Sequence, residues 1–252
     1  MLEELLRLNI FGFLLIFARV GTAIAFFPGF SAAYFSMRLR LGLALAISFA
    51  TMPVIAANLP IPPSSAPDLG IIVFGEMLVG SFIGLMARIL LATLQTAGTV
   101  IALASAMSNA LIQDPIAEQQ SSTISGFLLT VGMVLIFVTD LHHLMIYAVI
   151  ESYELFEPGK LFLSGDFANF LARRVADSFA LGVQLAAPAI VFGLTYYIGL
   201  GLLGRLMPQL PVFFFGLPVQ ISMQLWVLTV SISGIMIVFL ERFRTTIGNF
   251  VQ

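Results

Sequence analysis

Six long apolar stretches follow one another along this chain, separated by shorter polar or proline-rich segments. They cover residues 8–27, 39–57, 69–94, 124–150, 175–203 and about 213–240. A helix needs about 20 mostly apolar residues to cross roughly 30 Å of hydrocarbon. The pattern therefore predicts an all-α, integral membrane protein with about six long apolar helices.

The composition supports a lipid environment. The chain has 252 residues, of which 60% are hydrophobic and only 10% are charged. A soluble domain usually carries about 25% charged residues, so this chain could not cover its outside in water. The net charge of −2 provides no basic surface for nucleic acid. With no cysteine, thiolate catalysis and cysteine-based zinc sites are excluded. We expect lipid as a partner, no nucleic acid and no cofactor.

Four charged side chains lie inside the apolar stretches. They are Arg19, Glu76, Arg88 and Asp177. An ionisable group at membrane depth costs on the order of 2.5–3.5 kcal/mol on insertion scales. We expect these charges to pair between helices or between subunits. A proton relay is the alternative, but the sequence around Glu76 contains no polar neighbour for one.

Asp140, His142 and His143 form the most polar group inside the fourth apolar stretch. Neighbouring residues of a helix point about 100° apart, so adjacent histidines rarely bind one ion. We therefore expect no metal site here. The chain also contains no nucleophile motif, phosphate loop or dinucleotide fingerprint. The sequence predicts that the protein is not an enzyme, with an intramembrane enzyme using His142 or His143 as a remote alternative.

Small residues occur inside the third stretch and directly after it. Gly80 and Gly84 are four apart, and residues 96–112 are rich in Ala, Ser and Gly. Small residues at such spacing predict close packing of helix backbones. Residues 113–122 form the most polar run in the chain, with two acids and no base. That run is either a solvated loop or a loop that enters a cavity lined by protein or water.

A proline-rich segment joins the last two apolar stretches. Residues 204–218 contain Pro208, Pro211 and Pro218 together with several aromatic residues. Proline removes a backbone donor and disfavours helix, so we expect a non-helical or broken segment. Its backbone needs partners other than lipid. The aromatic residues make a free aqueous loop a poor interpretation, and a corner docked inside an assembly fits better.

This segment also carries a resemblance. Residues 205–213, followed by Gly216-Leu217-Pro218, resemble a hallmark of the FliR family of flagellar export-gate proteins. Two further features agree: Arg19 leading to Pro28, and the polar run that begins at Gln113. The likeness covers essentially the whole chain. One departure is Pro211, where many members have Asn, so a hydrogen bond made by that Asn is not carried over.

The resemblance implies a fold and a set of partners. It implies a FliP-like part in residues 1–170, fused to a FliQ-like helical hairpin in residues 171–252. Such proteins assemble with FliP-like and FliQ-like subunits into a closed channel in the bacterial inner membrane, at the flagellar basal body. Unfolded flagellar proteins pass through this channel. FlhB-like subunits dock at its cytoplasmic entrance.

The resemblance also implies functional segments. A plug of the channel maps to residues 105–122. Its candidate residues are Met107, Asn109, Gln113, Asp114, Pro115, Glu118 and Gln119. The corner near the cytoplasmic entrance maps to residues 205–218. Its candidate residues are Arg205, Pro208, Gln209, Phe213, Gly216 and Pro218.

We therefore expect a subunit of the flagellar type III protein export gate that forms part of the channel and its plug. The alternative is a secondary transporter for a small solute, because broken helices and intramembrane charge also serve that role. The absence of an internal repeat and of a polar cluster at the middle of a stretch weighs against this alternative.

Overall fold

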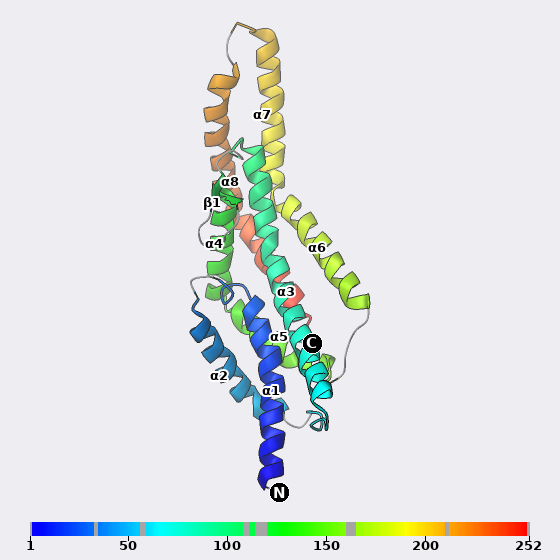
Figure 1. The fold of residues 1–252 in the computed structure, drawn as a ribbon. Helices are drawn as coiled ribbons and strands as arrows, with labels where there is room; N and C mark the ends of the chain where they lie inside the picture. Colours follow the sequence, from blue (N-terminus) through cyan, green and yellow to red (C-terminus); the bar gives the residue numbers. More distant parts are fainter. Residues whose placement is uncertain are drawn as a thin grey trace. The chain divides into compact units, whose positions relative to one another are not determined.

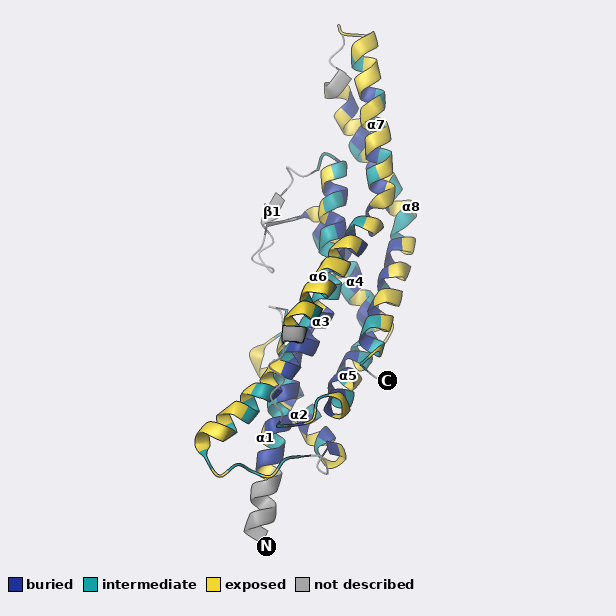
Figure 2. Ribbon diagram, turned by 90° about the vertical axis from the view of Figure 1, so that its right-hand side faces the viewer, coloured by how far each residue is buried: buried dark blue, intermediate teal, exposed yellow. Residues whose placement is uncertain are grey.

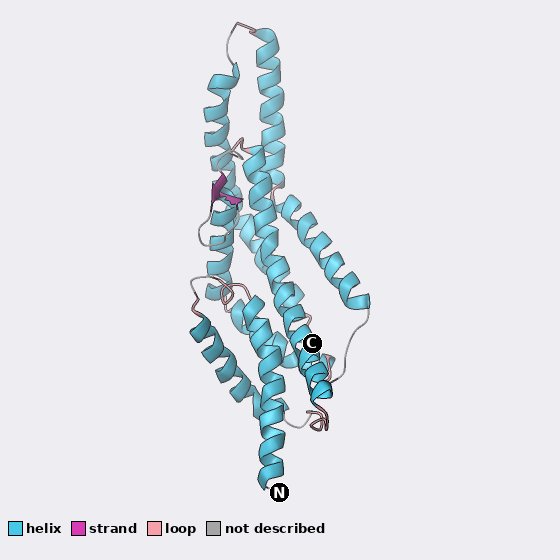
Figure 3. Cartoon of the chain, in the orientation of Figure 1, coloured by secondary structure: helices cyan, strands magenta, loops and turns pink. Residues whose placement is uncertain are grey.

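The computed structural model describes residues 2–32, 35–55, 59–107, 111–113, 120–159, 165–209 and 212–250. Within these ranges the chain is helical apart from one pair of short strands (Figures 1 and 3). The elements are α1 (Leu2–Phe26), α2 (Met37–Ile55), α3 (Ala66–Ala104), β1 (Leu111–Gln113), β2 (Gln120–Ser122), α4 (Thr123–Val138), α5 (Leu141–Leu155), α6 (Gly165–Leu185), α7 (Ala187–Leu206) and α8 (Val212–Gly248).

Four of these helices are long and apolar enough to cross a membrane. They are Met37–Ile55, Ala66–Ala104, Ala187–Leu206 and Phe214–Gly248. The helices α4 and α5 form a further span if the bent pair counts as one. The prediction of an all-α membrane protein is confirmed. Six apolar helices were expected, and the described residues contain four candidate spans, or five with the bent pair. The apolar part of α1, Ile10–Phe26, is shorter than the 18 residues that a candidate span needs.

Helix α3 is longer than the third apolar stretch. The stretch and the small-residue segment that follows it form one helix of 39 residues. Its start is capped by Ser65, whose hydroxyl accepts a hydrogen bond from the backbone N–H of Asp68 at 3.2 Å. The negative carboxylate of Asp68 in the first turn also interacts favourably with the positive end of the helix dipole. The helix then meets no proline before the polar run, so nothing in the backbone interrupts it.

Two apolar stretches are broken where the sequence analysis expected continuous helices. The fourth bends by 72° between α4 and α5. Asp140 lies at this bend in the left-handed region, with φ 58°. The fifth is interrupted at Ala186, two residues before Pro188, which lies in the first turn of α7. Proline suits that position because the first turn has no intrahelical donors to lose.

The segments between the stretches contain helix. Residues 151–174, between the fourth and fifth stretches, include the end of α5 and the first half of α6. The segment 204–218, expected to be non-helical or broken, is broken after α7 ends at Leu206, and it is helical again from Val212, with Pro218 inside α8. The first turns of α8 contact α7, where the hydroxyl of Tyr196 donates to the carbonyl of Gly216 at 2.7 Å.

The chain forms two compact units. Unit 1 comprises Met1–Ile89, Ile136–Arg174 and Phe243–Gln252, and unit 2 comprises Leu90–Leu135 and Val175–Arg242. The chain passes between the units within α3, α4, α6 and α8. The predicted boundary at residue 170 concerns likeness to two other subunits, and it stays a prediction.

In unit 1, α1 packs against the first half of α3. A Cβ on Gly80 would lie 2.1 Å from the carbonyl oxygen of Arg19, and one on Gly84 would lie 2.6 Å from Cβ of Phe26. No larger residue fits at either position, and the close packing predicted from this spacing is confirmed. The face of α1 beside these glycines is buried, including Leu15, Ile16 and Ala23.

In unit 2, the second half of α3 packs against α4, and α7 runs antiparallel to α8 (Figure 1). A Cβ on Gly98 would lie 2.4 Å from Cα of Ser125. On the hairpin of α7 and α8, the carboxamide of Gln224 donates to the carbonyl of Ala189 at 2.8 Å. The small residues of α3 therefore serve the close backbone packing that their composition predicted.

Candidate functional site

The first candidate site is the root of the loop between α3 and α4, in unit 2. Helix α3 ends in two backbone hydrogen bonds, from Ala106 to the carbonyl of Leu103 at 3.3 Å and from Met107 to that of Ala102 at 3.0 Å. This pair of bonds is the Schellman motif. Its turning residue, Ala106, has φ 57°, a conformation that glycine adopts more easily. The end of α3 is thus sharply defined.

Beyond this cap, the two arms of the loop pair as strands. β1 and β2 are antiparallel, with Leu111 opposite Ser122 and Gln113 opposite Gln120. The pairing brings the residues on either side of 114–119 together. The paired strands, residues 111–113 and 120–122, therefore form a hydrogen-bonded neck of the loop.

Buried hydroxyl groups attach the second arm to α3. Ser122 caps α4, since its Oγ accepts from the backbone N–H of Ser125 at 3.1 Å. The hydroxyl of Ser125 donates to the carbonyl of Gln95 at 3.1 Å and lies 3.1 Å from that of Thr99. Ser122 also donates to the carbonyl of Gly98 at 3.4 Å. These contacts fix the start of α4 against α3.

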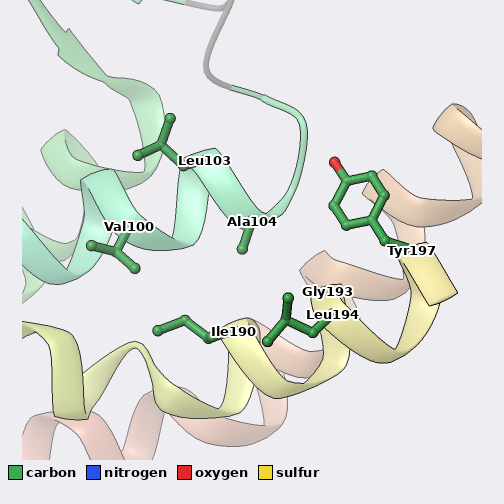
Figure 4. A pocket seen from close by; sticks show the side chains of 7 residues that line it. All are labelled: Val100, Leu103, Ala104, Ile190, Gly193, Leu194 and Tyr197. Carbon is green, nitrogen blue, oxygen red and sulfur yellow. The ribbon is translucent and has the colours of Figure 1, made fainter.

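The last turn of α3 is held from the other side by α7 and α8. The carboxamide of Gln220 donates to the carbonyl of Ala104 at 3.0 Å. An apolar pocket of about 220 Å³ opens beside the same turn, and Figure 4 shows its side chains. The pocket is lined by Val100, Leu103, Ala104, Ile190, Gly193, Leu194 and Tyr197. Both ends of the loop are therefore rooted in unit 2.

The structure describes two of the predicted plug residues. Met107 makes the second bond of the helix cap, and Gln113 lies in β1. The other predicted plug residues lie outside the described ranges: Asn109, Asp114, Pro115, Glu118 and Gln119.

The second candidate site is a buried ion pair in unit 1. Nε of Arg19, on α1, lies 2.7 Å from Oε2 of Glu76, on α3. The two side chains are only 1% and 2% exposed. The guanidinium also donates to Ser152 Oγ at 3.1 Å and to the carbonyl of Phe156 at 3.0 Å. All three guanidinium nitrogens of Arg19 therefore donate a hydrogen bond, and Glu76 supplies the opposite charge.

The remaining contacts close this network. The backbone N–H of Gly159 donates to Oε1 of Glu76 at 3.3 Å. The guanidinium carbon of Arg19 lies 3.8 Å from the ring centroid of Tyr153, a favourable cation–π arrangement. Arg88 and Asp177, the other two predicted charges, are exposed and take no part in it.

The predicted corner joins α7 to α8. Arg205 lies in the last turn of α7 and is exposed, as are Pro208 and Gln209. In α8, Gly216 is buried and Pro218 is exposed. Phe213 belongs to α8, and its side chain is not among those described.

Several residues at these sites escaped the sequence analysis. Ser122 and Ser125 carry the loop root, and Ser152 and Tyr153 complete the ion-pair network. A usable signal existed for Gln220 and Gln224, two amides at helical spacing in an otherwise apolar helix. Both are buried and donate to carbonyls of other helices. The serines carried no such signal, because hydroxyl groups are common throughout the chain.

The candidate spans and the buried charge network define an integral membrane helical protein. The profile of a family described as "Bacterial export proteins, family 1" matches residues 10–246. The chain therefore belongs to this family, the FliR family of export proteins.

Named relatives agree with this assignment. The chain is 37% identical to the flagellar biosynthetic protein FliR of Caulobacter vibrioides over 236 residues, 94% of each chain. It is 30% identical to FliR of Bacillus subtilis over 240 residues, 93% of this chain and 91% of the relative. It is 26% identical to Yop proteins translocation protein T of Yersinia pestis over 185 residues, 72% of this chain and 70% of the relative. The predicted family is confirmed.

Proposed function

We propose that this protein is a non-enzymatic subunit of the flagellar type III protein export gate in the bacterial inner membrane. The observation that carries the proposal is the match of nearly the whole chain to flagellar biosynthetic proteins. Its partners are FliP-like, FliQ-like and FlhB-like subunits, and unfolded flagellar proteins pass through the assembly. The likeness to a Yop translocation protein supports an export role over solute transport.

The surface of α7 and α8 fits a subunit that is covered by others. Large apolar side chains are exposed along both helices, and α7 is coloured mainly as exposed in Figure 2. Exposed apolar patches of this extent mark contact with lipid or protein. We propose that this hairpin is the FliQ-like part, with its corner at Arg205 to Pro218 facing the cytoplasmic entrance.

Within the gate, we propose that the loop of residues 105–122 closes the channel. Its neck is a pair of strands, and its two roots are held by hydrogen bonds among α3, α4 and α8. Of these helices, α3 and α8 are apolar enough to cross a membrane. A loop held in this way can present its tip to a pore without unravelling the helices behind it. Polar backbone at that depth is tolerated where it lines a water-filled cavity.

The buried charges argue against the alternative of a small-solute transporter. Among the described residues, Arg19 and Glu76 are the only buried charged side chains, and they satisfy each other. A transport site keeps polar groups available to its solute. This closed network instead serves to join α1, α3 and α5.

A loop replacement tests the closure. Residues 108–119 are replaced by a short Gly-Ser linker, which leaves in place the cap of α3 and the contacts of Ser122 and Ser125 with α3. We expect cells that carry this variant to leak ions and small solutes. The same variant in cells without the FliP-like and FliQ-like subunits is the control, since no channel forms there. Unchanged permeability in a fully assembled complex would refute the closure.

Affinity purification tests membership of the gate separately. A tagged copy of the full chain is extracted in mild detergent, and co-purifying proteins are identified by mass spectrometry. We expect FliP-like and FliQ-like subunits in one large complex. A stable, monodisperse protein without partners would overturn the assignment to the gate, whatever the loop does.

A further inference from the structure

A group of three metal-ligand side chains lies at the break between α4 and α5. Asp140, His142 and His143 each offer one ligand atom, and these atoms all lie within 4.8 Å of one another. Carboxylate and imidazole ligands bind zinc at about 2.0–2.2 Å, which places the ligands of one ion roughly 3.3 Å apart. Small side-chain rotations would bring these atoms to that separation.

The backbone at the break presents the carboxylate to the histidines. Asp140 precedes α5 with φ 58° and ψ 15°, and its side chain makes no capping hydrogen bond. The carboxylate is instead turned toward α5, with Oδ1 3.6 Å from Nδ1 of His143.

The rings of the two histidines lie against each other in the first turn of α5. Their ring centroids are 4.1 Å apart. The ring of His142 stacks on Phe137, with centroids 5.0 Å apart, and so is held in place. Its Nδ1 is buried and has no hydrogen-bond partner within the described part of the chain. The geometric objection to adjacent histidines, drawn from the sequence, does not hold at this helix start.

We propose that Asp140, His142 and His143 bind a divalent first-row transition ion, with zinc as the best match. Two imidazole nitrogens and one carboxylate oxygen, completed by water, are a common ligand set for zinc. The side chains of His143 and Asp140 are 60% and 74% exposed, so an ion can enter. The bound ion ties Asp140 to the first turn of α5.

The composition makes the test unusually clean. The chain contains only two histidines and no cysteine, so any imidazole–metal signal comes from this site. The full chain is purified in detergent through a tag without histidine, stripped of metal, and titrated with Zn²⁺ and Co²⁺. We expect one ion per chain, together with the visible absorption bands of a Co²⁺ ion bound by nitrogen.

Three variants decide the assignment. His143→Asn and Asp140→Asn change exposed side chains, and each is expected to weaken binding at least tenfold. Glu151→Gln, further along α5, is the control and should bind as the unmodified chain does. Circular dichroism and elution volume show whether each variant is folded. Absence of stoichiometric binding, or equal binding by all three variants, would overturn the proposal.

Discussion

At the residue scale, the Arg19–Glu76 pair gives the first prediction. Replacing Glu76 by Gln leaves a buried guanidinium without its counter-charge. Loss of one partner of a buried pair costs about 3–5 kcal/mol. We expect the thermal midpoint of the detergent-solubilised protein to fall steeply, and Arg19→Met to behave alike. Arg88→Gln, at an exposed position of α3, should change the midpoint little.

The double variant separates pairing from general disruption. With both charges gone, in Arg19→Met with Glu76→Leu, no unpaired charge remains in the core. The destabilisation should then be clearly smaller than the sum of the two single effects. A strictly additive result would mean that the two side chains do not stabilise one another.

Ala106 gives a second prediction at this scale. Its φ of 57° is unfavourable for alanine and natural for glycine. Ala106→Gly should therefore raise the stability by up to about 1 kcal/mol. The same change at Ala104, within the last helical turn, should lower the stability by about 1 kcal/mol.

Thermal unfolding of the two glycine variants checks these opposite signs. Ala106→Val adds a third point, because a branched side chain is strongly disfavoured at positive φ. Equal effects at positions 104 and 106 would show that α3 does not end in the left-handed cap.

At the element scale, the approach of α3 to α4 is limited by Gly98. Its Cβ would lie 2.4 Å and 2.7 Å from backbone atoms of Ser125, which cannot rotate away. Gly98→Ala should therefore separate the two helices and break the hydroxyl contacts at the loop root. Gly199→Ala, in α7, has nothing within 4 Å and should be neutral or slightly stabilising. Yield of folded protein and resistance to protease compare the two, and equal behaviour would contradict the close contact.

The helices could be predicted from the sequence more readily than their breaks. Helix α2 lies largely within the second apolar stretch, and the start of α3 follows from the prolines at 60, 62 and 63 that precede it. The bend at Asp140 could not be predicted, because no proline or glycine marks it. Pro218 lies inside α8, so the break in the helices is shorter than the three prolines indicated.

The candidate sites were also only partly predictable from the sequence. Arg19 and Glu76 stand out in sequence because a charge in an apolar stretch is costly. Their mutual pairing could not be predicted, because 57 residues separate them and only the fold brings α1 and α3 together. The loop root depends on Ser122 and Ser125, which look ordinary in sequence and matter only through the helix they face.

At the scale of the whole molecule, the outer surface is as informative as the core. On α8, Val219, Trp226, Val230 and Ile237 are large, apolar and exposed, and they fall on one face of the helix. Trp226 and Val230 are 75% and 65% exposed. Such a face is stable only against lipid or another subunit. The free chain is therefore an incomplete structure whose surroundings supply the missing contacts.

Val230→Lys tests what covers this face. On insertion scales a lysine at the centre of a span costs about 2.5–3.5 kcal/mol, and an unpaired charge between subunits costs at least as much. We expect the amount of membrane-inserted, assembled complex to fall at least tenfold. Val230→Thr has the same shape and no charge, and its hydroxyl can bond to the preceding turn. It should assemble nearly as the unmodified chain does. If the lysine variant assembles equally well, this face of α8 meets water, and the proposed packing of the hairpin among partner subunits is wrong.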